Sequence, residues 1–274
     1  MTTCNAETRV ALVTGASSGV GEACANALLG QGYRVIGASR RSRMAASSIN
    51  FLSMAMDVSS RDSVDAAIEN IRHTVGRVDL LVNSAGYSLV GAVEDTSDDE
   101  ARAQLETNLL GTWRLCRAVS PMMRAQNGGC IINIGSIGGR IGLPFQAAYS
   151  ASKFGLAGLT EALSAELRAW HIRVVLIELG NYKTGITANR TIAKCAKGPS
   201  PYAARFQAAT RIIAEAEENG RSPEEVAKLV VRVADAESPR LSYQIGPIVE
   251  RVAIIAKAIL PSRAFERLLV RQYS

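Results

Sequence analysis

The fold of this chain of 274 residues is decided by the stretch Val13-Thr14-Gly15-Ala16-Ser17-Ser18-Gly19-Val20-Gly21. An apolar run over 10–14 leads into it, and a helical pattern over 19–29 follows it. Its glycines permit a sharp turn and a close approach of the backbone to a ligand. The free N–H groups and the positive dipole end of the next helix attract phosphate. Although the spacing differs from G-x-G-x-x-G, the strand–turn–helix context predicts a turn that binds a dinucleotide pyrophosphate.

Short apolar runs alternate with helical patterns beyond this turn. The expected strands are 10–14, 33–39, 51–58, 78–83, 130–135 and 172–178, and the expected helices are 19–29, 60–75, 98–124 and 146–170. This alternation indicates a parallel sheet with helices on both faces. The almost continuous apolar character of the strands agrees with burial on both sides. We therefore predict an α/β, doubly wound parallel sheet of the Rossmann type.

The pattern becomes less regular after Glu178. Residues 180–201 are polar, which is typical of a mobile flap over a site. Ser222-Pro223-Glu224-Glu225 is a helix start with Ser as N-cap, a last strand is expected at 241–245, and helix continues over 247–273. Without an internal repeat or a linker, we predict one domain over 1–274. Its cofactor and catalytic core would be 8–185, and 186–274 would supply the substrate flap and the C-terminal helices.

Composition excludes several classes of protein. The net charge is +6, but Lys and Arg are spread along the chain and aromatic residues make up only 5%. A nucleic-acid partner is therefore not expected, and an anionic cofactor or substrate explains the charge as well. The two histidines do not suggest a metal site, and no charge-free apolar stretch reaches about 18 residues, so no membrane span is expected.

The cysteines and the N-terminus indicate a cytoplasmic protein. Five cysteines are present, an odd number without a C-x-x-C pair, which is typical of free thiols in a reducing compartment. Residues 1–7 do not resemble a basic and apolar leader, so a signal peptide is not expected.

The residues at the end of the second strand bear on the choice of cofactor. An acidic residue here would bind the adenosine ribose hydroxyls of NAD. The chain instead has Ser39-Arg40-Arg41. A guanidinium pairs with a 2′-phosphate, and no carboxylate repels it, so we predict NADP, as NADPH, with Ser17 and Ser18 as hydroxyl donors to the same phosphate. The alternative is that both arginines are solvated loop charges.

Tyr149 and Lys153 are the candidate proton-transfer pair. Four residues apart, they share one face of the helix predicted over 146–170. A cation beside a phenol favours the phenolate and would lower the tyrosine pKa from about 10. Such a tyrosine can exchange a proton with a carbonyl or an alcohol near neutral pH.

These motifs together resemble the short-chain dehydrogenase/reductase family, over roughly residues 8–185. The resemblance rests on Thr14-Gly15-x-x-x-Gly19-x-Gly21, Asp57-Val58, Asn83-Ser84-Ala85-Gly86, Asn108, Ser136 and Tyr149-x-x-x-Lys153. A finer resemblance, to the 17β-hydroxysteroid and retinol dehydrogenase branch, rests on Ser39-Arg40 and Pro239-Arg240-Leu241-Ser242-Tyr243. The resemblance to the family implies homodimers or homotetramers formed through the helices expected at 98–124 and 146–170.

The resemblance implies specific roles. Tyr149 would be the general acid or base, and Lys153 would lower its pKa and hold the nicotinamide ribose. Ser136 would bind the substrate oxygen. Asn108 would hold a water that serves as a proton relay. Further cofactor contacts would come from Asp57 and Val58 at the adenine, from Asn83, Ala85 and Gly86 at the ribose and nicotinamide, and from Gly180 and Thr184. Leu179-Gly180 stands where the family often has Pro-Gly, and Ser84 replaces a frequent Asn.

The expected substrate is a small-molecule carbonyl or alcohol. Candidate pocket residues are Ile137, Gly138, Leu143, Phe145, Tyr182 and the flap over 186–205, with Ser136 and Tyr149 at the reacting oxygen. Their apolar character favours a hydrophobic or polycyclic compound. We predict an NADP(H)-dependent oxidoreductase that interconverts a secondary alcohol and a ketone. The alternatives are a catalytically silent NADP-binding sensor or scaffold, and a lyase, epimerase or dehydratase on the same fold.

Overall fold

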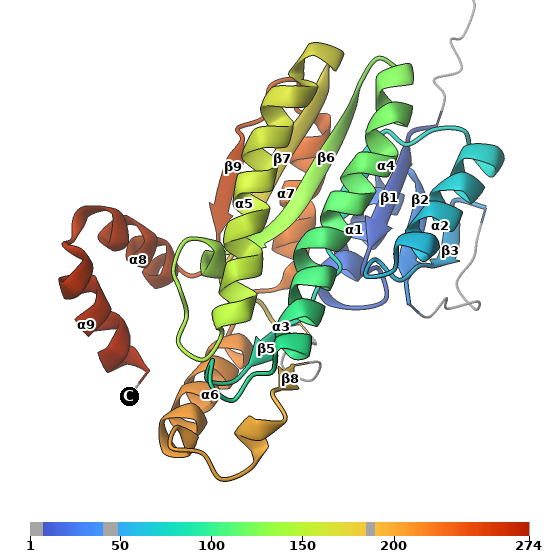
Figure 1. Ribbon diagram of the computed structural model, residues 1–274. Coiled ribbons are helices and arrows are strands. Elements are labelled where there is room, and N and C mark those ends of the chain that lie inside the picture. Colours follow the sequence, from blue (N-terminus) through green and yellow to red (C-terminus); the bar gives the residue numbers. More distant parts are fainter. Residues whose placement is uncertain (1–7, 41–48, 185–189, 274) are drawn as a thin grey trace, which may run out of the picture.

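A parallel sheet of seven strands forms the centre of the protein (Figure 1). The computed structural model describes residues 8–40, 49–184 and 190–273. The order across the sheet is β3-β2-β1-β4-β6-β7-β9. These strands are β1 (Val10–Thr14), β2 (Arg34–Ser39), β3 (Phe51–Ala55), β4 (Leu80–Asn83), β6 (Gly129–Ser136), β7 (Ile172–Leu179) and β9 (Ser242–Ile245). The predicted α/β doubly wound fold is confirmed.

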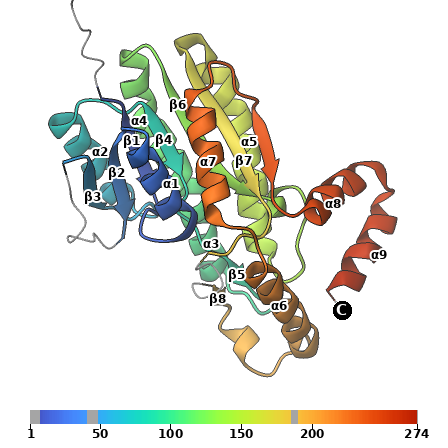
Figure 2. The same ribbon diagram turned by 180° about the vertical axis from the view of Figure 1, so that it is seen from behind.

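Helices cover both faces of the sheet, as Figures 1 and 2 show. One face carries α1 (Gly19–Gly30) and α7 (Pro223–Asp235), and the other carries α2 (Arg61–Thr74), α4 (Gly111–Ala125) and α5 (Ala147–Leu167). The apolar strand residues divide between these faces, because successive side chains point to opposite sides. Leu12 packs with the α2 and α4 side, whereas Val13 packs with the α1 and α7 side. Both layers therefore bury a continuous apolar core.

The position of the site follows from the topology. β1 pairs with β2 on one side and with β4 on the other, so the chain reverses its direction of winding between β1 and β4. In open α/β sheets, ligands bind outside the carboxyl ends of the strands at such a switch point. The glycine-rich turn follows β1, and the Asn83-Ser84-Ala85-Gly86 segment follows β4.

The helix expected over 98–124 is interrupted. The chain forms α3 (Asp98–Leu105), a π-helical segment (Glu106–Leu110) and then α4. Ser97 and Glu100 make reciprocal hydrogen bonds that cap α3, which explains its start. Short π-helical segments inside α-helices are frequent at functional sites. The candidate residue Asn108 lies within this segment.

Several short elements, most of them after β7, were not distinguished by the sequence pattern. β5 (Leu89–Val90) pairs in parallel with β8 (Thr191–Ile192), and α6 (Ala203–Glu218) packs nearby. Short 3-10 helices occur at Ile137–Gly139, Arg168–Trp170 and Cys195–Lys197. The long helix expected over 247–273 is split into α8 (Ile248–Ile259) and α9 (Ser262–Gln272). Pro261 separates them, because proline cannot continue a helix.

Three further observations concern the cysteines, the length of the helices and the possible metal ligands. Cys24, Cys116 and Cys130 are buried and Cys195 is exposed, all as free thiols, while Cys4 lies outside the described residues. Across the described ranges, the helices lack the length and apolar character that a membrane span requires. Within the same ranges, acidic residues, Cys and His do not gather into a group able to hold a metal.

Candidate active site

The glycine-rich turn has the backbone shape that a dinucleotide requires. Gly15 and Gly19 adopt φ angles of +69° and +58°, in the left-handed region that favours glycine. A Cβ at Gly21 would lie 2.3 Å from the carbonyl oxygen of Gly15, so the first turn of α1 packs directly on the loop. This leaves the N-terminus of α1 next to the turn, where its N–H groups suit a pyrophosphate. The residues present therefore fit a dinucleotide cofactor.

The segment after β4 lies against this turn. A Cβ at Gly15 would be 3.0 Å from the Cα of Ala85. The Thr14 hydroxyl accepts hydrogen bonds from the backbone N–H groups of Ser84 and Ala85, each 3.1 Å long. Ala85 therefore borders the turn, and Gly86 follows it against the Asn108 side chain. Both residues therefore lie next to the turn, and their contact with a cofactor stays a prediction.

The Asn83 side chain does not point to the predicted ribose site. Its Nδ2 donates to Asn133 Oδ1 over 2.9 Å, and Asn133 Nδ2 donates to Thr160 Oγ1 over 2.9 Å. Asn83 and Asn133 are paired across β4 and β6, and Thr160 lies on α5. The side chain of Asn83 is thus part of a buried polar ladder that joins two strands to α5. The alternation of the strand directs this side chain into the interior, and a contact of Asn83 with the cofactor stays a prediction.

The residues proposed to select NADP are only partly described. Arg40 is exposed at the end of β2, and its charge acts on the nearby Tyr87 phenol. Arg41 lies outside the described residues. Asp57 accepts hydrogen bonds from the backbone N–H and the hydroxyl of Ser59, over 2.9 and 2.6 Å. Val58 is buried against Gly111 of α4, and its position beside an adenine stays a prediction.

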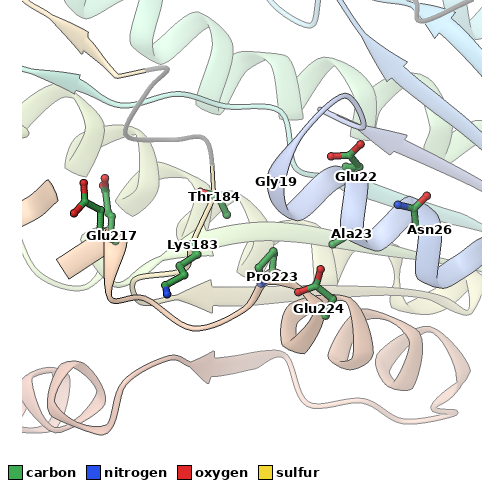
Figure 3. A pocket seen from close by; sticks show the side chains of 10 residues that line it. Gly19, Glu22, Ala23, Asn26, Lys183, Thr184, Glu217, Pro223 and Glu224 are labelled. Atoms are coloured by element: carbon green, nitrogen blue, oxygen red, sulfur yellow. The ribbon is translucent and has the colours of Figure 1, made fainter. Parts of the chain in front are cut away.

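A pocket of about 620 Å³ opens beside the turn (Figure 3). Residues of α1, α6, α7 and the segment after β7 line it: Gly19, Glu22, Ala23, Asn26, Lys183, Thr184, Glu217, Glu218, Pro223 and Glu224. Thr184 faces Gly19, where an added Cβ would lie 3.1 Å from the threonine Cβ. Carboxylates outnumber the single lysine in this lining, which disfavours phosphate there. The N–H groups of the turn are therefore the better candidates for binding phosphate.

Ser136 and Tyr149 lie on either side of Gly138. Ser136 ends β6, and the 3-10 helix over Ile137–Gly139 follows it. A Cβ at Gly139 would lie 2.7 Å from the backbone oxygen of Lys153, so this short helix packs closely on α5. A Cβ at Gly138 would lie 3.4 Å from Ser136 Oγ and 3.0 Å from Cε1 of the Tyr149 ring, so both side chains border the same residue. The Ser136 hydroxyl also accepts the backbone N–H of Gly138 over 3.1 Å.

Lys153 does not have the expected effect on the tyrosine. Its Nζ donates to the backbone oxygen of Ile134 over 2.8 Å and lies 5.9 Å from the centre of the Tyr149 ring. Burial raises the pKa of Tyr149, and Glu217 raises it further, whereas the hydrogen bond with Ser136 lowers it. The predicted fall in the tyrosine pKa is therefore wrong for this structure. The two residues share a helix face as expected, but the lysine ammonium is held by β6.

The side chain of Asn108 is fully engaged with protein groups. Its Nδ2 donates to the backbone oxygen of Tyr87 over 2.9 Å and to Ser152 Oγ over 3.3 Å. Its Oδ1 accepts the backbone N–H of Tyr87 over 3.1 Å. Asn108 thus joins the π-helical segment, the loop after β4 and α5. A relay water bound by this side chain would have to displace one of these bonds.

The predicted substrate residues fall into two groups. Leu143 lies near the site, since a Cβ at Gly138 would be 3.0 Å from the Tyr149 ring and 3.3 Å from Leu143 Cδ1. Ile137 is half-buried directly after Ser136. Tyr182, by contrast, is buried in the core between the sheet, α1 and α7, where burial raises its pKa to about 12. Its expected place in the substrate pocket is not supported, because the chain after β7 turns toward α7.

Other predicted residues take different neighbours. Gly180 donates its N–H to Ile245 of β9 over 2.9 Å and lies against the start of α8. Phe145 packs edge-to-face on Phe206 of α6, with ring centres 5.7 Å apart. Of the flap over 186–205, only residues from 190 onward belong to the described residues.

An ion pair beside the site was not predicted from the sequence. Glu178, fully buried at the end of β7, accepts a hydrogen bond from Arg140 Nε over 2.6 Å. Ser242 and Gln244 of β9 donate to the second oxygen of the same carboxylate. The pair fixes the loop after Ser136 to two strands. The only signal in the sequence for this ion pair was a glutamate at the end of an apolar strand. Its partner, Arg140, is 38 residues away in the sequence, so no local pattern connects the two.

The buried Lys153 ammonium leads to a prediction about stability. Burial lowers the pKa of Lys153 from 10.5 to about 8. Below pH 8 the lysine is charged in both states, and the folded state carries the full cost of burying that charge. Between pH 8 and 10.5 the folded protein loses the proton first, so stability rises with pH. Lys153→Met should therefore unfold at a higher urea concentration than wild type at pH 7, with a free energy of unfolding that is larger by on the order of 2 kcal/mol. This gain in stability should shrink toward pH 10.

Urea unfolding at pH 7 and at pH 10 measures both effects. Lys228→Met, at an exposed lysine of α7, is the matched control and should show neither. An equal response of both variants at both pH values would contradict the assignment of the buried charge to Lys153.

The sheet order, the glycine-rich turn and the Ser136–Tyr149–Lys153 arrangement define a nucleotide-binding oxidoreductase fold. The family model described as short chain dehydrogenase matches residues 9–194. The chain belongs to the short-chain dehydrogenase/reductase family. It is an oxidoreductase of this family that acts on a carbonyl or alcohol substrate, and the family uses a nicotinamide cofactor.

Individual relatives give a closer comparison. The 3-ketodihydrosphingosine reductase of Bacteroides thetaiotaomicron is 37% identical over 258 residues, which cover 94% of this chain and 95% of that protein. The 3-oxoacyl-acyl-carrier-protein reductase FabG of Salmonella typhimurium is 37% identical over 66% of this chain and 76% of its own length. A crystal structure of a short-chain dehydrogenase from Streptomyces avermitilis aligns with a TM-score of 0.82 at 32% identity, covering 94% of each chain.

Proposed function

We propose that this protein reduces a ketone on a hydrophobic compound to a secondary alcohol, with NADPH as cofactor and Tyr149 as the general acid. The observation that carries the proposal is the position of the Ser136 hydroxyl and the Tyr149 ring on either side of Gly138. Two side chains with hydroxyl groups that border the same residue can both reach one carbonyl oxygen. The reverse reaction would use the same tyrosine as general base.

The chain's own residues hold the substrate oxygen and move the proton. A bound nicotinamide cofactor supplies hydride chemistry. The Tyr149 phenol donates a proton to the carbonyl oxygen, and the Ser136 hydroxyl donates a hydrogen bond to the same atom. Charge that develops on this oxygen is stabilised by both donors. Lys153 would have to leave the backbone oxygen of Ile134 in order to bind a ribose or return a proton to the tyrosine.

The turn after β1 and the end of β2 would hold the cofactor. The N–H groups at the start of α1 suit the pyrophosphate, and Ala85 and Gly86 border the same turn. Arg40, with Ser17 and Ser18 on the facing loop, would bind the 2′-phosphate. Exposure of Arg40 leaves its guanidinium accessible for this contact.

The proposed substrate class is a long-chain ketone. The relative from Bacteroides thetaiotaomicron, matched along almost the whole chain, is named as a reductase of 3-ketodihydrosphingosine. Leu143 supplies apolar surface close to Tyr149, which suits a hydrocarbon chain. The FabG relative is named for 3-oxoacyl groups, which are also ketones on a chain. A polycyclic ketone, which the finer resemblance favours, is the second substrate to test.

A panel of ketones tests the activity. Purified protein should consume NADPH with 3-ketodihydrosphingosine faster than with a 3-oxoacyl thioester, a polycyclic ketone or a short-chain ketone. Mass spectrometry should identify the secondary alcohol. If none of these ketones is reduced while NADPH still binds, the catalytically silent sensor becomes the better description.

The cofactor assignment gives a separate prediction. Arg40→Ala should weaken NADPH binding by about 10- to 100-fold, because a charge-assisted hydrogen bond to phosphate is lost. NADH lacks this phosphate, so its affinity should change by less than about twofold. Fluorescence titration with both nucleotides measures the difference, and Arg61→Ala, at an exposed arginine of α2, is a matched control. Equal losses for NADPH and NADH would refute the phosphate contact.

We further propose that copies of the chain associate through α4 and α5. Both helices carry large apolar side chains at the surface, with Trp113 of α4 53% exposed and Phe154 of α5 43% exposed. An association that covers them would give a homodimer, or a homotetramer if a second face also pairs. Light scattering after gel filtration tests it, and Trp113→Glu should reduce the mass observed.

A further inference from the structure

The two C-terminal helices form a hairpin that projects from the sheet. In Figures 1 and 2, α8 and α9 lie away from the layers that cover the strands. Neither helix contains a buried residue. Ile248, Val249 and Ile259 are each at least 74% exposed, a level unusual for aliphatic side chains. The hairpin therefore leaves apolar surface without cover in the isolated chain.

The exposed apolar residues of α8 share one face of the helix. Ile248, Val252, Ile255 and Ile259 follow each other at spacings of four, three and four residues, which is the spacing of a single helical stripe. Leu268 and Val270 add exposed apolar side chains on α9. Contiguous apolar surface of this kind on a soluble fold marks a site of interaction.

Positive charge accompanies this apolar surface. Residues 247–273 contain five basic side chains and two acidic ones, a net charge of +3: Arg251, Lys257, Arg263, Arg267 and Arg271 against Glu250 and Glu266. Both glutamates have partners within the protein. Glu250 accepts the backbone N–H of Asn181 over 2.9 Å, and Glu266 pairs with Arg263 over 2.9 Å.

The basic surface extends beyond the hairpin. Arg251 lines a hollow of about 190 Å³ between α7 and the start of α8, together with Arg221, Lys228 and Arg232. Glu225 offsets one of these charges through its ion pair with Arg221. The face formed by α8 and α9 therefore combines aliphatic side chains with an excess of cations, which disfavours pairing with an identical face on a second copy.

We propose that the α8–α9 hairpin docks on the surface of an anionic lipid bilayer. Helices with aliphatic residues beside Lys and Arg lie in the plane of the membrane interface, where acyl chains cover the apolar face and acidic headgroups bind the cations. α8 has 12 residues and is about 18 Å long, which is shorter than the hydrocarbon core of about 30 Å. The hairpin therefore rests on the bilayer and does not cross it.

Docking would bring the bilayer close to the catalytic loop. Lys257 of α8 donates a hydrogen bond to the backbone oxygen of Arg140, in the loop that follows Ser136. The Lys257 ammonium also lies 5.0 Å from the centre of the Phe154 ring of α5. A ketone dissolved in the bilayer would thus enter near Tyr149; this consequence rests on the proposed function, whereas docking itself does not.

Flotation with vesicles tests the proposal on the full chain. Wild-type protein should float with vesicles of phosphatidylcholine that contain about 30% phosphatidylserine, and binding to pure phosphatidylcholine should be at least about tenfold weaker. Ile255→Glu/Ile259→Glu should abolish binding, and Arg267→Glu/Arg271→Glu should weaken it at least about tenfold. Val93→Glu, at an aliphatic residue 73% exposed just after β5, is the matched control and should bind like wild type.

Circular dichroism verifies that each variant is folded, and light scattering reports its mass. Failure of wild type to float with anionic vesicles would overturn the proposal. So would equal binding to neutral vesicles, or unchanged binding by the Ile255→Glu/Ile259→Glu variant. A dimer that this variant converts to a monomer, without any vesicle binding by wild type, would show that a second copy covers the face instead. Because no readout uses turnover, the outcome is separate from that of the proposed activity.

Discussion

Tyr149→Phe is expected to lower kcat for ketone reduction by about 10³-fold while the affinity for NADPH stays within about twofold of wild type. The phenol is the proton donor in the proposed reaction, and phenylalanine keeps the ring but lacks that proton. Tyr149 is 9% exposed, so the ring also fills space in the site. The variant should therefore fold normally. Steady-state turnover and nucleotide titration measure the two quantities separately.

Ser136→Ala is the companion variant. It removes one hydrogen bond to the reacting oxygen and leaves the proton donor in place, so a loss of about 10²-fold is expected. The Gly138 N–H would lose its acceptor, which adds a small cost in stability. Turnover by Tyr149→Phe at the wild-type rate would exclude the proposed mechanism, even if Ser136→Ala proved inactive.

Gly21→Ala is expected to weaken NADPH binding by at least about 100-fold and to lower the free energy of unfolding by about 2 kcal/mol. The added Cβ would lie 2.3 Å from the carbonyl oxygen of Gly15 and 3.0 Å from that of Thr14. Both are backbone atoms and cannot rotate away as a side chain would. The turn must therefore move, and the N–H groups that are to bind the pyrophosphate move with it. Nucleotide titration and urea unfolding measure the two effects.

Gly30→Ala provides the matched control on the same helix. Gly30 is the last residue of α1, and a Cβ there would meet no atom within 4 Å. Alanine favours the helical state over glycine, so this variant should be as stable as wild type or up to about 1 kcal/mol more stable. Its NADPH affinity should not change. Similar losses in both variants would mean that the close packing at Gly21 is not what shapes the turn.

Local sequence patterns predicted most of the sheet and of the surrounding helices. β1 begins and ends at the predicted residues, and the other six sheet strands lie at or within the predicted ranges to within about a residue. These segments combine a strong apolar pattern with glycine or capping residues at their ends, so local chemistry and the fold agree. The helix over 98–124 was predicted but its interruption was missed, because α-helical and π-helical hydrogen bonding share the same hydrophobic pattern. α6 was also missed: it follows the polar segment over 180–201, and no element was predicted between that segment and the helix start at Ser222.

The candidate site was predictable where a motif fixes the backbone. The turn at Gly15 and the neighbouring Ala85 occupy the predicted positions, since glycine spacing and strand order together determine them. Side-chain directions were less predictable. Asn83 points into a buried ladder and Tyr182 into the core, because strand alternation and the path after β7 decide which way each side chain turns.

The sequence by itself determined the doubly wound sheet, the glycine-rich turn and the shared helix face of Tyr149 and Lys153, because each depends on residues close together in the chain. The tertiary structure decided which contacts the two side chains on that face make. The Lys153 ammonium is held by the backbone of β6, and burial of Tyr149 raises its pKa. The ion pair of Arg140 with Glu178 and the exposed face of α8 also appear only in three dimensions. Burial and long-range contacts depend on which distant segments meet, and no local pattern specifies this.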